Sequence, residues 1–306
     1  MEAGPLISIV IPLYNKEQYI ERTVRSVLAQ TYENFELIVV DDGSTDFGPD
    51  IVRNILDERL RLVVRKNGGV SAARNTGIHE ARADYVAFLD ADDEWLPDFL
   101  LTVVGLIRDY PAAKTFITNF IIVKPDGSEK IISLESRSTC LWHLRDYIMQ
   151  CVAGNSVINA RNIVTQKFLL DQIKGFPVGQ SRGEDLDTWF RLLEMAPAAY
   201  CRKPLAVYNY NLPGSITITN HKVNASWLLS ELTQNLKEKK YDNDIKDAIV
   251  HYLAWRKMLK MNLLYITGQS LFDPDVFIIL RSPYFRYRYF RLLVKSLLKR
   301  KRGSGG

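Results

Sequence analysis

Short apolar runs alternate with amphipathic segments in the first part of the chain, and this pattern predicts strands and helices. Buried strands rich in β-branched residues are predicted at residues 7–12, 36–41, 60–65 and 85–89. The segments between them have the apolar spacing of helices, at residues 18–30, 49–56 and 70–81. Such βαβ alternation predicts an α/β fold with a mostly parallel sheet flanked by helices on both faces.

The alternation weakens beyond residue 98, where the chain has a different organisation. Residues 115–123 and 130–134 flank the turn sequence Pro125-Asp126-Gly127-Ser128, which predicts a β-hairpin. Helices are predicted at 141–150 and 184–195, and the pattern is helical almost throughout from residue 222. We therefore expect two domains, a sheet-containing domain over residues 1–218 and a helical C-terminal region over residues 219–306.

Composition indicates a globular protein of ordinary type. With 306 residues, of which 47% are hydrophobic and 25% charged, the chain can bury a large core. Its three cysteines lack metal-ligand spacing and are odd in number, so we expect reduced thiols. The chain has no basic-then-apolar leader, and no apolar run reaches the roughly 18 residues of a spanning helix. These features together favour a cytoplasmic protein.

Positive charge is concentrated at the C-terminal end. The formal net charge is +5, but nine basic residues and no acidic ones follow residue 280, so the preceding residues carry −4. Apolar residues at helix-face spacing within 282–301 predict an amphipathic helix, either packed on the protein body or lying on an anionic membrane surface. We favour the membrane, which would make the protein peripheral on the inner face of the cell membrane. No nucleic-acid recognition motif accompanies the charge, so no nucleic-acid partner is expected.

Polar clusters follow each of the four predicted strands, and ligands of parallel sheets bind at the carboxyl ends of strands. After the first strand, Pro12 and Tyr14 place an aromatic ring where it either lies against a nucleobase or caps the core. The same segment has neither a G-x-G-x-x-G nor a G-x-x-x-x-G-K-[ST] motif, which argues against a nicotinamide-dinucleotide site and a P-loop.

The second and third strands are also followed by candidate binding residues. Asp41 and Asp42 begin a tight turn, where a carboxylate either caps the next helix or accepts hydrogen bonds from a base or ribose. The Gly68-Gly69 turn leads into a helix start that favours anions, and Arg74 lies one turn further on. The alternative role for Arg74 is a surface ion pair.

The fourth strand ends in the sequence Asp90-Ala91-Asp92-Asp93-Glu94, which is the most informative segment of the chain. Carboxylates this close together stay ionised only with a counter-charge between them. All-oxygen ligands at a strand end favour Mg or Mn bound together with substrate phosphates, although acidic residues are also common in turns and helix caps. A second acidic group, Glu184 and Asp185, opens a predicted helix, where it either complements the helix dipole or supplies a general base.

Five segments in this order resemble the family-two glycosyltransferases of GT-A fold, which transfer a sugar from an activated nucleotide donor to a hydroxyl acceptor. They lie between residues 6 and 195 and read I-S-I-V-I-P-L-Y-N-K, F-E-L-I-V-V-D-D-G-S-T-D, K-N-G-G-V-S-A-A-R-N-T-G-I, Y-V-A-F-L-D-A-D-D and G-E-D-L-D-T-W-F-R-L. Each segment is weakly specific by itself, whereas the ordered set is strongly specific. The resemblance implies a Rossmann-like nucleotide half and an acceptor half, with the helical C-terminal region as an extension.

The resemblance also assigns roles to residues of these segments. The nucleotide-binding residues would be Pro12, Tyr14, Asp41, Asp42, Gly69, Arg74 and Asp90. Asp90 and Asp92 match the family's D-x-D, so Asp92, together with Asp90, would hold Mn or Mg at the diphosphate, with Asp90 also near the ribose. Asp185 matches the general base, with Glu184 as its close competitor.

The implied reaction is a single displacement that inverts the anomeric configuration. By the resemblance the donor is a nucleotide-diphosphate sugar, with a uridine nucleotide favoured. The acceptor is a glycan or a lipid-linked molecule of bacterial surface polysaccharide or glycolipid synthesis. The chain departs from the family pattern at residues 208–217, which carry neither the histidine nor the arginine that many relatives have near the diphosphate.

Two rival functions stay in view. A phosphohydrolase of the haloacid dehalogenase type also uses a strand-end D-x-D, but on the first strand of its sheet, whereas three βα units precede Asp90. The second rival is a nucleotide-sugar-binding, membrane-docked protein without turnover.

Overall fold

The computed structural model describes residues 4–131, 139–153, 155, 157–180, 183–210, 212, 226–238 and 240–266. The chain divides into two compact units. One comprises residues 1–143 and 157–225 and contains every strand of the described part, whereas the other comprises residues 144–156 and 226–306 and is helical where described. The predicted domain boundary at residue 218 lies outside the described residues and stays a prediction.

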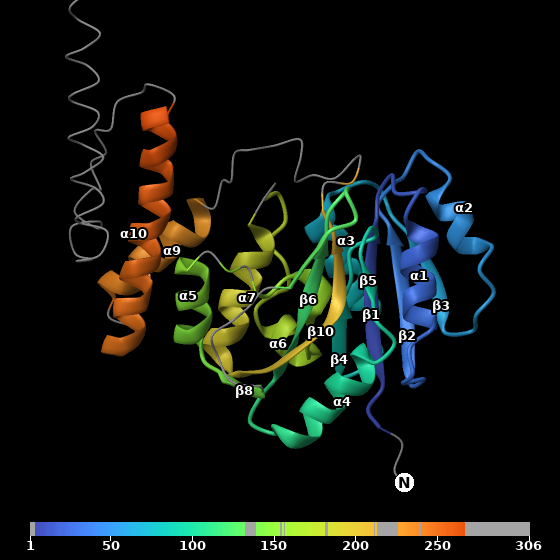
Figure 1. The fold of residues 1–306 in the computed structure, drawn as a ribbon, viewed down its shortest axis with the longest axis horizontal. Coiled ribbons are helices and arrows are strands. Elements are labelled where there is room, and N and C mark those ends of the chain that lie inside the picture. The colour runs from blue at the N-terminus through green and yellow to red at the C-terminus, as the bar shows by residue number, and fades with distance from the viewer. Residues whose placement is uncertain are drawn as a thin grey trace, which may run out of the picture. The chain divides into compact units, whose positions relative to one another are not determined.

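The first unit is built on a ten-stranded sheet whose main order is β3-β2-β1-β4-β9-β6-β10-β5 (Figure 1). Its parallel half consists of the four predicted strands, β1 (Ile7–Leu13), β2 (Phe35–Asp41), β3 (Leu60–Val64) and β4 (Tyr85–Phe88). Apolar residues fill β1 and are buried on both of its faces, as expected for a central parallel strand. The predicted α/β fold is confirmed, and the parallel pairing that was predicted holds for these four strands.

The other half of the sheet mixes strand directions. β9 (Ile163–Gln166) runs antiparallel between β4 and β6 (Thr115–Val123), and β10 (Ala198–Asn209) runs parallel to β6. Three short strands pair antiparallel to these, β7 (Glu129–Ile131) with β6, and β5 (Glu94–Trp95) and β8 (Thr139–Trp142) with β10. Because β9 is antiparallel, its first residues lie at the same edge of the sheet as the last residues of β4.

Helices cover both faces of the parallel half, as predicted. α1 (Ile20–Leu28), α2 (Gly48–Arg53) and α4 (Phe99–Asp109) contribute to a core on one face that includes Ile9 and Ile11 of β1. α3 (Val70–Glu80) packs on the other face, where a Cβ on Gly77 would lie 2.2 Å from a methyl carbon of Val10. Glycine at this position therefore lets α3 pack directly on β1.

A cluster of three aromatic rings joins β4 to the later part of this unit. Phe88 pairs in register with Val10 and so points to the same face as α3. Its ring lies edge-on to Phe176 at 5.1 Å between centroids, and Phe176 lies edge-on to Trp189 at 5.5 Å. Phe176 follows α6 (Lys167–Gln172), and Trp189 belongs to α7 (Glu184–Met195). The cluster thereby places the first turn of α7 near the end of β4.

Two predictions for the middle of the chain are confirmed and one is wrong at its start. The hairpin is confirmed by the pairing of β6 with β7, and the helix at 184–195 is α7. The helix predicted from residue 141 begins later, because Leu141 and Trp142 belong to β8 and α5 starts at Leu144 (Leu144–Val152). Trp142 is buried by stacking on Tyr200 of β10 at 4.5 Å, which favours strand pairing over helix.

The second unit contains α5, α9 (Ser226–Lys237) and α10 (Asn243–Ile266), as the helical pattern predicted from residue 222. α10 packs on α5 and contacts α9, with Ile148, Ile249 and Leu253 buried. Within the described helices, none combines the length and the apolar content needed to cross a bilayer. The basic segment 282–301 lies outside the described residues.

Candidate active site

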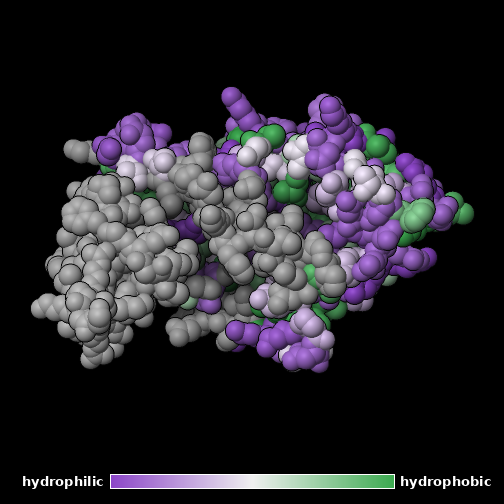
Figure 2. Space-filling view, turned by 90° about the horizontal axis from the view of Figure 1, so that it is seen from above, coloured by the Kyte–Doolittle hydropathy of each residue, from purple (hydrophilic) through white to green (hydrophobic). Residues whose placement is uncertain are grey.

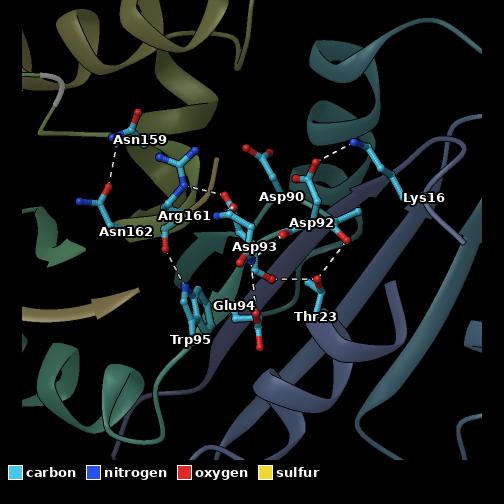
Figure 3. A network of polar contacts seen from close by, with 12 residues as sticks. Lys16, Thr23, Asp90, Asp92, Asp93, Glu94, Trp95, Asn159, Arg161 and Asn162 are labelled. Atoms are coloured by element: carbon cyan, nitrogen blue, oxygen red, sulfur yellow. Dashed lines mark hydrogen bonds and ion pairs between the residues drawn. The ribbon is translucent and has the colours of Figure 1, made fainter. Parts of the chain in front are cut away.

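The loop after β4 carries three carboxylates side by side at the carboxyl edge of the sheet (Figure 3). Its backbone is fixed, because the Asp93 N–H donates to the carbonyl oxygen of Asp90 at 3.0 Å. The buried Thr23 of α1 adds its Oγ1, which lies 3.0 Å from the carbonyl oxygen of Ala91 and 2.8 Å from that of Asp93. With its backbone bonds satisfied in this way, the loop leaves its carboxylates free for charged partners.

Each of these carboxylates faces a cation from a different part of the chain. Arg74 of α3 donates to Asp90 at 2.7 Å, and Lys16 of the loop after β1 donates to Asp92 at 2.6 Å. The third cation is Arg161, which donates from Nε to Asp93 at 2.6 Å. It lies in the short 3₁₀ turn Ala160–Asn162, which precedes β9. The predicted counter-charge is thus supplied in part by the protein itself.

Arg74 joins the two acidic groups that the sequence separates by more than ninety residues. Its Nη2 bonds to Asp90, and its Nη1 bonds to Glu184 at 3.2 Å. The Arg74 side chain is buried, with a residue exposure of 4%. The carboxyl end of β4 and the first turn of α7 therefore belong to one site, and Arg74 is a buried bridge rather than a surface ion pair.

The start of α7 places two acids in different surroundings. Glu184 is buried and paired with Arg74, whereas Asp185 accepts the Leu186 N–H at 2.8 Å and is partly exposed. Burial raises the pKa of Glu184, and the neighbouring charge of Asp185 raises it further. Burial likewise raises the pKa of Asp185, which Arg74 partly opposes.

Electrostatics also separate the acids of the β4 loop. Burial by itself would raise the pKa of Asp90, but Arg74, Arg161 and Lys16 together hold it below its usual value. Burial raises the pKa of Asp93 to about 7, against the opposing pull of Arg161. Asp90 is therefore held ionised more firmly than Asp93.

The turn after β2 is arranged differently. Asp42 accepts the backbone N–H groups of Gly68 (3.1 Å) and Gly69 (2.7 Å), and it also forms an ion pair with Arg65. Asp41 accepts the Ser44 N–H at 2.9 Å. Both aspartates are buried, with residue exposures of 4% for Asp41 and 3% for Asp42.

The remaining predicted nucleotide-binding residues lie beside this turn. β1 and β2 pair so that Leu13 stands opposite Asp41, which brings Pro12 and Tyr14 to the same edge. Tyr14 is 50% exposed, and Gly69 is exposed at the start of α3 with φ +88°. Figure 2 looks down on this edge and shows a mostly hydrophilic surface, with separate hydrophobic residues, towards the α2 and β3 end.

Sequence reasoning missed the roles of Lys16, Arg161 and Asn209 in this site. Asn209 Nδ2 donates to the carbonyl oxygen of Asp92 at 3.0 Å and to Glu94 at 3.2 Å. Lys16 ends one of the recognised segments, which was a usable signal. Arg161 and Asn209 belong to no recognised segment, and their partners are far away in the sequence.

The site fits a divalent cation shared with a substrate. The described residues contain no group of three or more histidine, cysteine or carboxylate side chains that would hold a metal alone. Mg²⁺ in nucleotide sites usually binds one or two carboxylates plus phosphates and waters, so Asp92 and Asp90 suffice. At the end of β4 and the start of α7, five acids face three cations that pair with them, and this excess of acids favours a bound cation: Asp90, Asp92, Asp93, Glu184 and Asp185 against Lys16, Arg74 and Arg161.

Comparison with known proteins gives a consistent picture. The family model "Glycosyl transferase family 2" matches residues 8–151. A putative teichuronic acid biosynthesis glycosyltransferase of Bacillus subtilis, TuaG, is 34% identical over 201 residues, which cover 64% of this chain and 75% of that protein. An uncharacterised glycosyltransferase of Rickettsia felis is 28% identical over 238 residues, covering 77% of this chain and 39% of that protein.

Solved structures agree on the fold. Staphylococcus aureus TarS (residues 1–349) in complex with UDP-GlcNAc superposes with a TM-score of 0.70 at 19% identity, over 85% of this chain and 75% of that chain. The same protein in complex with UDP superposes with a TM-score of 0.67 at 19% identity, over 90% of this chain and 81% of that chain. At this sequence identity, both similarities show a shared fold.

Proposed function

Because this chain belongs to glycosyltransferase family 2, we propose that it transfers a sugar from a nucleotide-diphosphate donor to an acceptor hydroxyl, inverting the anomeric configuration. One observation carries the proposal. Arg74 is bonded to both Asp90 and Glu184 and so holds the D-x-D loop and the first turn of α7 in one site. A donor phosphate at the loop and an acceptor hydroxyl at α7 can then be held in reacting geometry.

At the donor end, Asp92 and Asp90 are the proposed ligands of Mn or Mg. A divalent cation held there would stabilise the negative charge that the departing diphosphate acquires. On metal binding, Asp92 would give up its ion pair with Lys16 and contact the cation instead. Arg74 meanwhile keeps Asp90 ionised. The site accordingly needs no proton transfer to the leaving group.

At the acceptor end, Asp185 is the proposed general base. Its Oδ1 accepts the Leu186 N–H, whereas the structure gives Oδ2 no hydrogen bond among the described residues. Glu184 competes poorly, because it is buried and paired with Arg74. A pKa raised by burial strengthens Asp185 as a proton acceptor towards a hydroxyl. Attack from this side, opposite the diphosphate, gives inversion.

The nucleoside is proposed to lie over the ends of β1 and β2. Tyr14 offers an exposed ring for the base, and Pro12, Asp41, Asp42, Gly69 and Arg74 line the same edge. UDP and UDP-GlcNAc complexes of TarS, a protein of the same fold, support a uridine nucleotide as donor.

The acceptor is proposed to be a glycan or a lipid-linked molecule of surface polysaccharide or glycolipid synthesis. The similarity to TuaG, named for teichuronic acid biosynthesis, supports this class. We place the protein at the inner face of the membrane through residues 282–301. Deleting these residues should abolish co-sedimentation with anionic vesicles, and undiminished co-sedimentation would contradict the membrane role.

Asp185→Asn tests the reaction directly. Nucleotide sugars are screened with Mn²⁺ for transfer and hydrolysis, and the variant should lose about 10²- to 10⁴-fold in rate while still binding the donor nucleotide. Asp50→Asn, at an exposed ion pair of α2, is the matched control and should keep full activity.

Other outcomes of this screen would favour the rivals. Phosphate release from a simple phosphoester, without sugar transfer, would indicate a phosphohydrolase. Thermal stabilisation of the wild-type protein by a UDP-sugar with Mn²⁺, without turnover over hours, would indicate a binding protein.

A further inference from the structure

Arg161 is a buried cation with only part of its hydrogen-bonding capacity used. Its residue exposure is 8%, and its Nε donates to Asp93 Oδ2 at 2.6 Å. The guanidinium lies 3.9 Å from the ring centroid of Tyr208 and 5.4 Å from that of Phe120. Asp93 therefore holds one edge of the guanidinium, and the ring of Tyr208 lies within cation–π distance of it.

The opposite edge of this guanidinium has no hydrogen-bond partner in the part of the chain that the structure describes. Among the described residues, the structure gives neither Nη nitrogen of Arg161 a hydrogen bond. These two nitrogens carry four N–H donors, and they are not among the enclosed side-chain atoms that lack a partner, so a ligand can reach them. Such an arrangement is typical of a group that is held ready for a ligand.

The free edge lies where the two ends of the site meet. In Figure 3 the guanidinium of Arg161 extends to the level of the Asp90 carboxylate, away from the Trp95 side of the network. Its positive charge acts on both acids, opposing the effect of burial on the pKa of Asp90 and of Asp185. Lys16 reaches the same acidic loop from the β1 side, at Asp92.

We infer that the two Nη groups of Arg161 bind the β-phosphate of the donor, which is the phosphate that carries the sugar. This inference rests on the proposed function, since it needs a nucleoside-diphosphate donor in the site. A guanidinium fork matches two oxygens of one phosphate, which a lysine ammonium does not. Arg161 would then stabilise the charge that develops as the glycosidic bond breaks.

The test compares nucleoside diphosphate with monophosphate. Affinities of wild-type protein, Arg161→Gln and Arg161→Lys are measured by calorimetry in Mn²⁺ for UDP and UMP, and for the GDP/GMP and dTDP/dTMP pairs. We expect Arg161→Gln to weaken diphosphate binding by about tenfold or more and to leave monophosphate binding unchanged. The diphosphate affinity of Arg161→Lys should fall between those of wild-type protein and Arg161→Gln, because lysine keeps the charge and loses the guanidinium fork.

A second arginine that contacts the same loop, Arg22 of α1, provides the control. Arg22 pairs with Glu94 at 2.9 Å and donates to the carbonyl oxygen of Asp92, but its side chain is 44% exposed. Arg22→Gln therefore disturbs the loop without removing a buried fork, and it should leave the diphosphate-to-monophosphate ratio unchanged. Thermal unfolding of each variant confirms that it is folded.

Three results would overturn the inference. Equal loss of diphosphate and monophosphate binding in Arg161→Gln would make Arg161 only a support of the loop, and no loss of either would leave it without a ligand. Loss confined to UDP-glucuronic acid, measured in the same way, with UDP binding intact, would place the contact on a sugar carboxylate. If the wild-type protein binds none of the diphosphates, the proposed function fails as well.

Discussion

The acidic turns after β2 and β4 lie on either side of β1 and use their carboxylates in opposite ways. After β2, the partners of Asp42 are Arg65 and the backbone N–H groups of the turn at residues 68–69, all within 27 positions of the chain. After β4, the cations come from three separate elements. The first arrangement fastens one loop to another, whereas the second leaves ion pairs that a charged ligand can rearrange.

Asp92→Ala gives the largest expected difference between the two turns. Removing a proposed metal ligand should lower metal-dependent transfer by about 10³-fold, because charge on the leaving group is no longer stabilised. Its ion pair with Lys16 is partly exposed, so the free energy of unfolding should change by no more than about 1 kcal/mol. Kinetics with Mn²⁺ and urea unfolding measure the two quantities. Activity near the wild-type level would remove Asp92 from the metal site.

Asp42→Ala should lower the free energy of unfolding far more than Asp92→Ala does. It leaves two backbone donors and Arg65 without their acceptor in a buried turn, which should cost about 3 kcal/mol in the free energy of unfolding. Asp50→Ala removes an exposed ion pair with Arg53 and should cost no more than about 0.5 kcal/mol. Equal urea midpoints for these two variants would contradict the structural role of Asp42.

Lys16→Met tests whether the ion pairs of the β4 loop really are exchangeable. Without an ammonium 2.6 Å from Asp92, the carboxylate loses a competitor, and Mn²⁺ affinity should rise by about three- to tenfold. The electron paramagnetic resonance signal of free Mn²⁺ reports this binding without turnover. A weaker affinity would mean that Lys16 supports the site instead of competing for it.

The pH dependence extends the comparison to α7 and should be the smallest effect. Burial raises the pKa of Asp185 above its ordinary value of 3.8, and a base acts only when deprotonated. The rate should therefore rise with pH through a limb centred above 3.8 and lie highest on its alkaline side. Profiles of kcat/KM for wild-type protein and Asp185→Asn measure this, and persistence of the limb in the variant would assign it to another group.

The parallel half of the fold could be predicted because each of its strands is a continuous apolar run between turn residues. β9 was not predictable in this way, since its four residues have no distinctive period and it pairs antiparallel between β4 and β6. The acids of the site could be predicted because they are neighbours in the sequence, at the end of a strand and at the start of a helix. Of their three cations, Arg74 was found because it lies in a recognised segment, whereas the pairings of the other two were not predictable, because Lys16 and Asp92 are 76 positions apart and Arg161 and Asp93 are 68 apart. Pairings over such distances are set by topology, which local pattern does not encode.

The aromatic cluster of Phe88, Phe176 and Trp189 is an uncharged contact between β4 and α7. It couples the last residue of β4 to α7 by ring packing, which neither salt nor protonation weakens. Donor entry, metal exchange and product release all alter the charge at the two acidic groups but not this packing. The distance between the two acidic groups can therefore stay constant through every stage of a catalytic cycle.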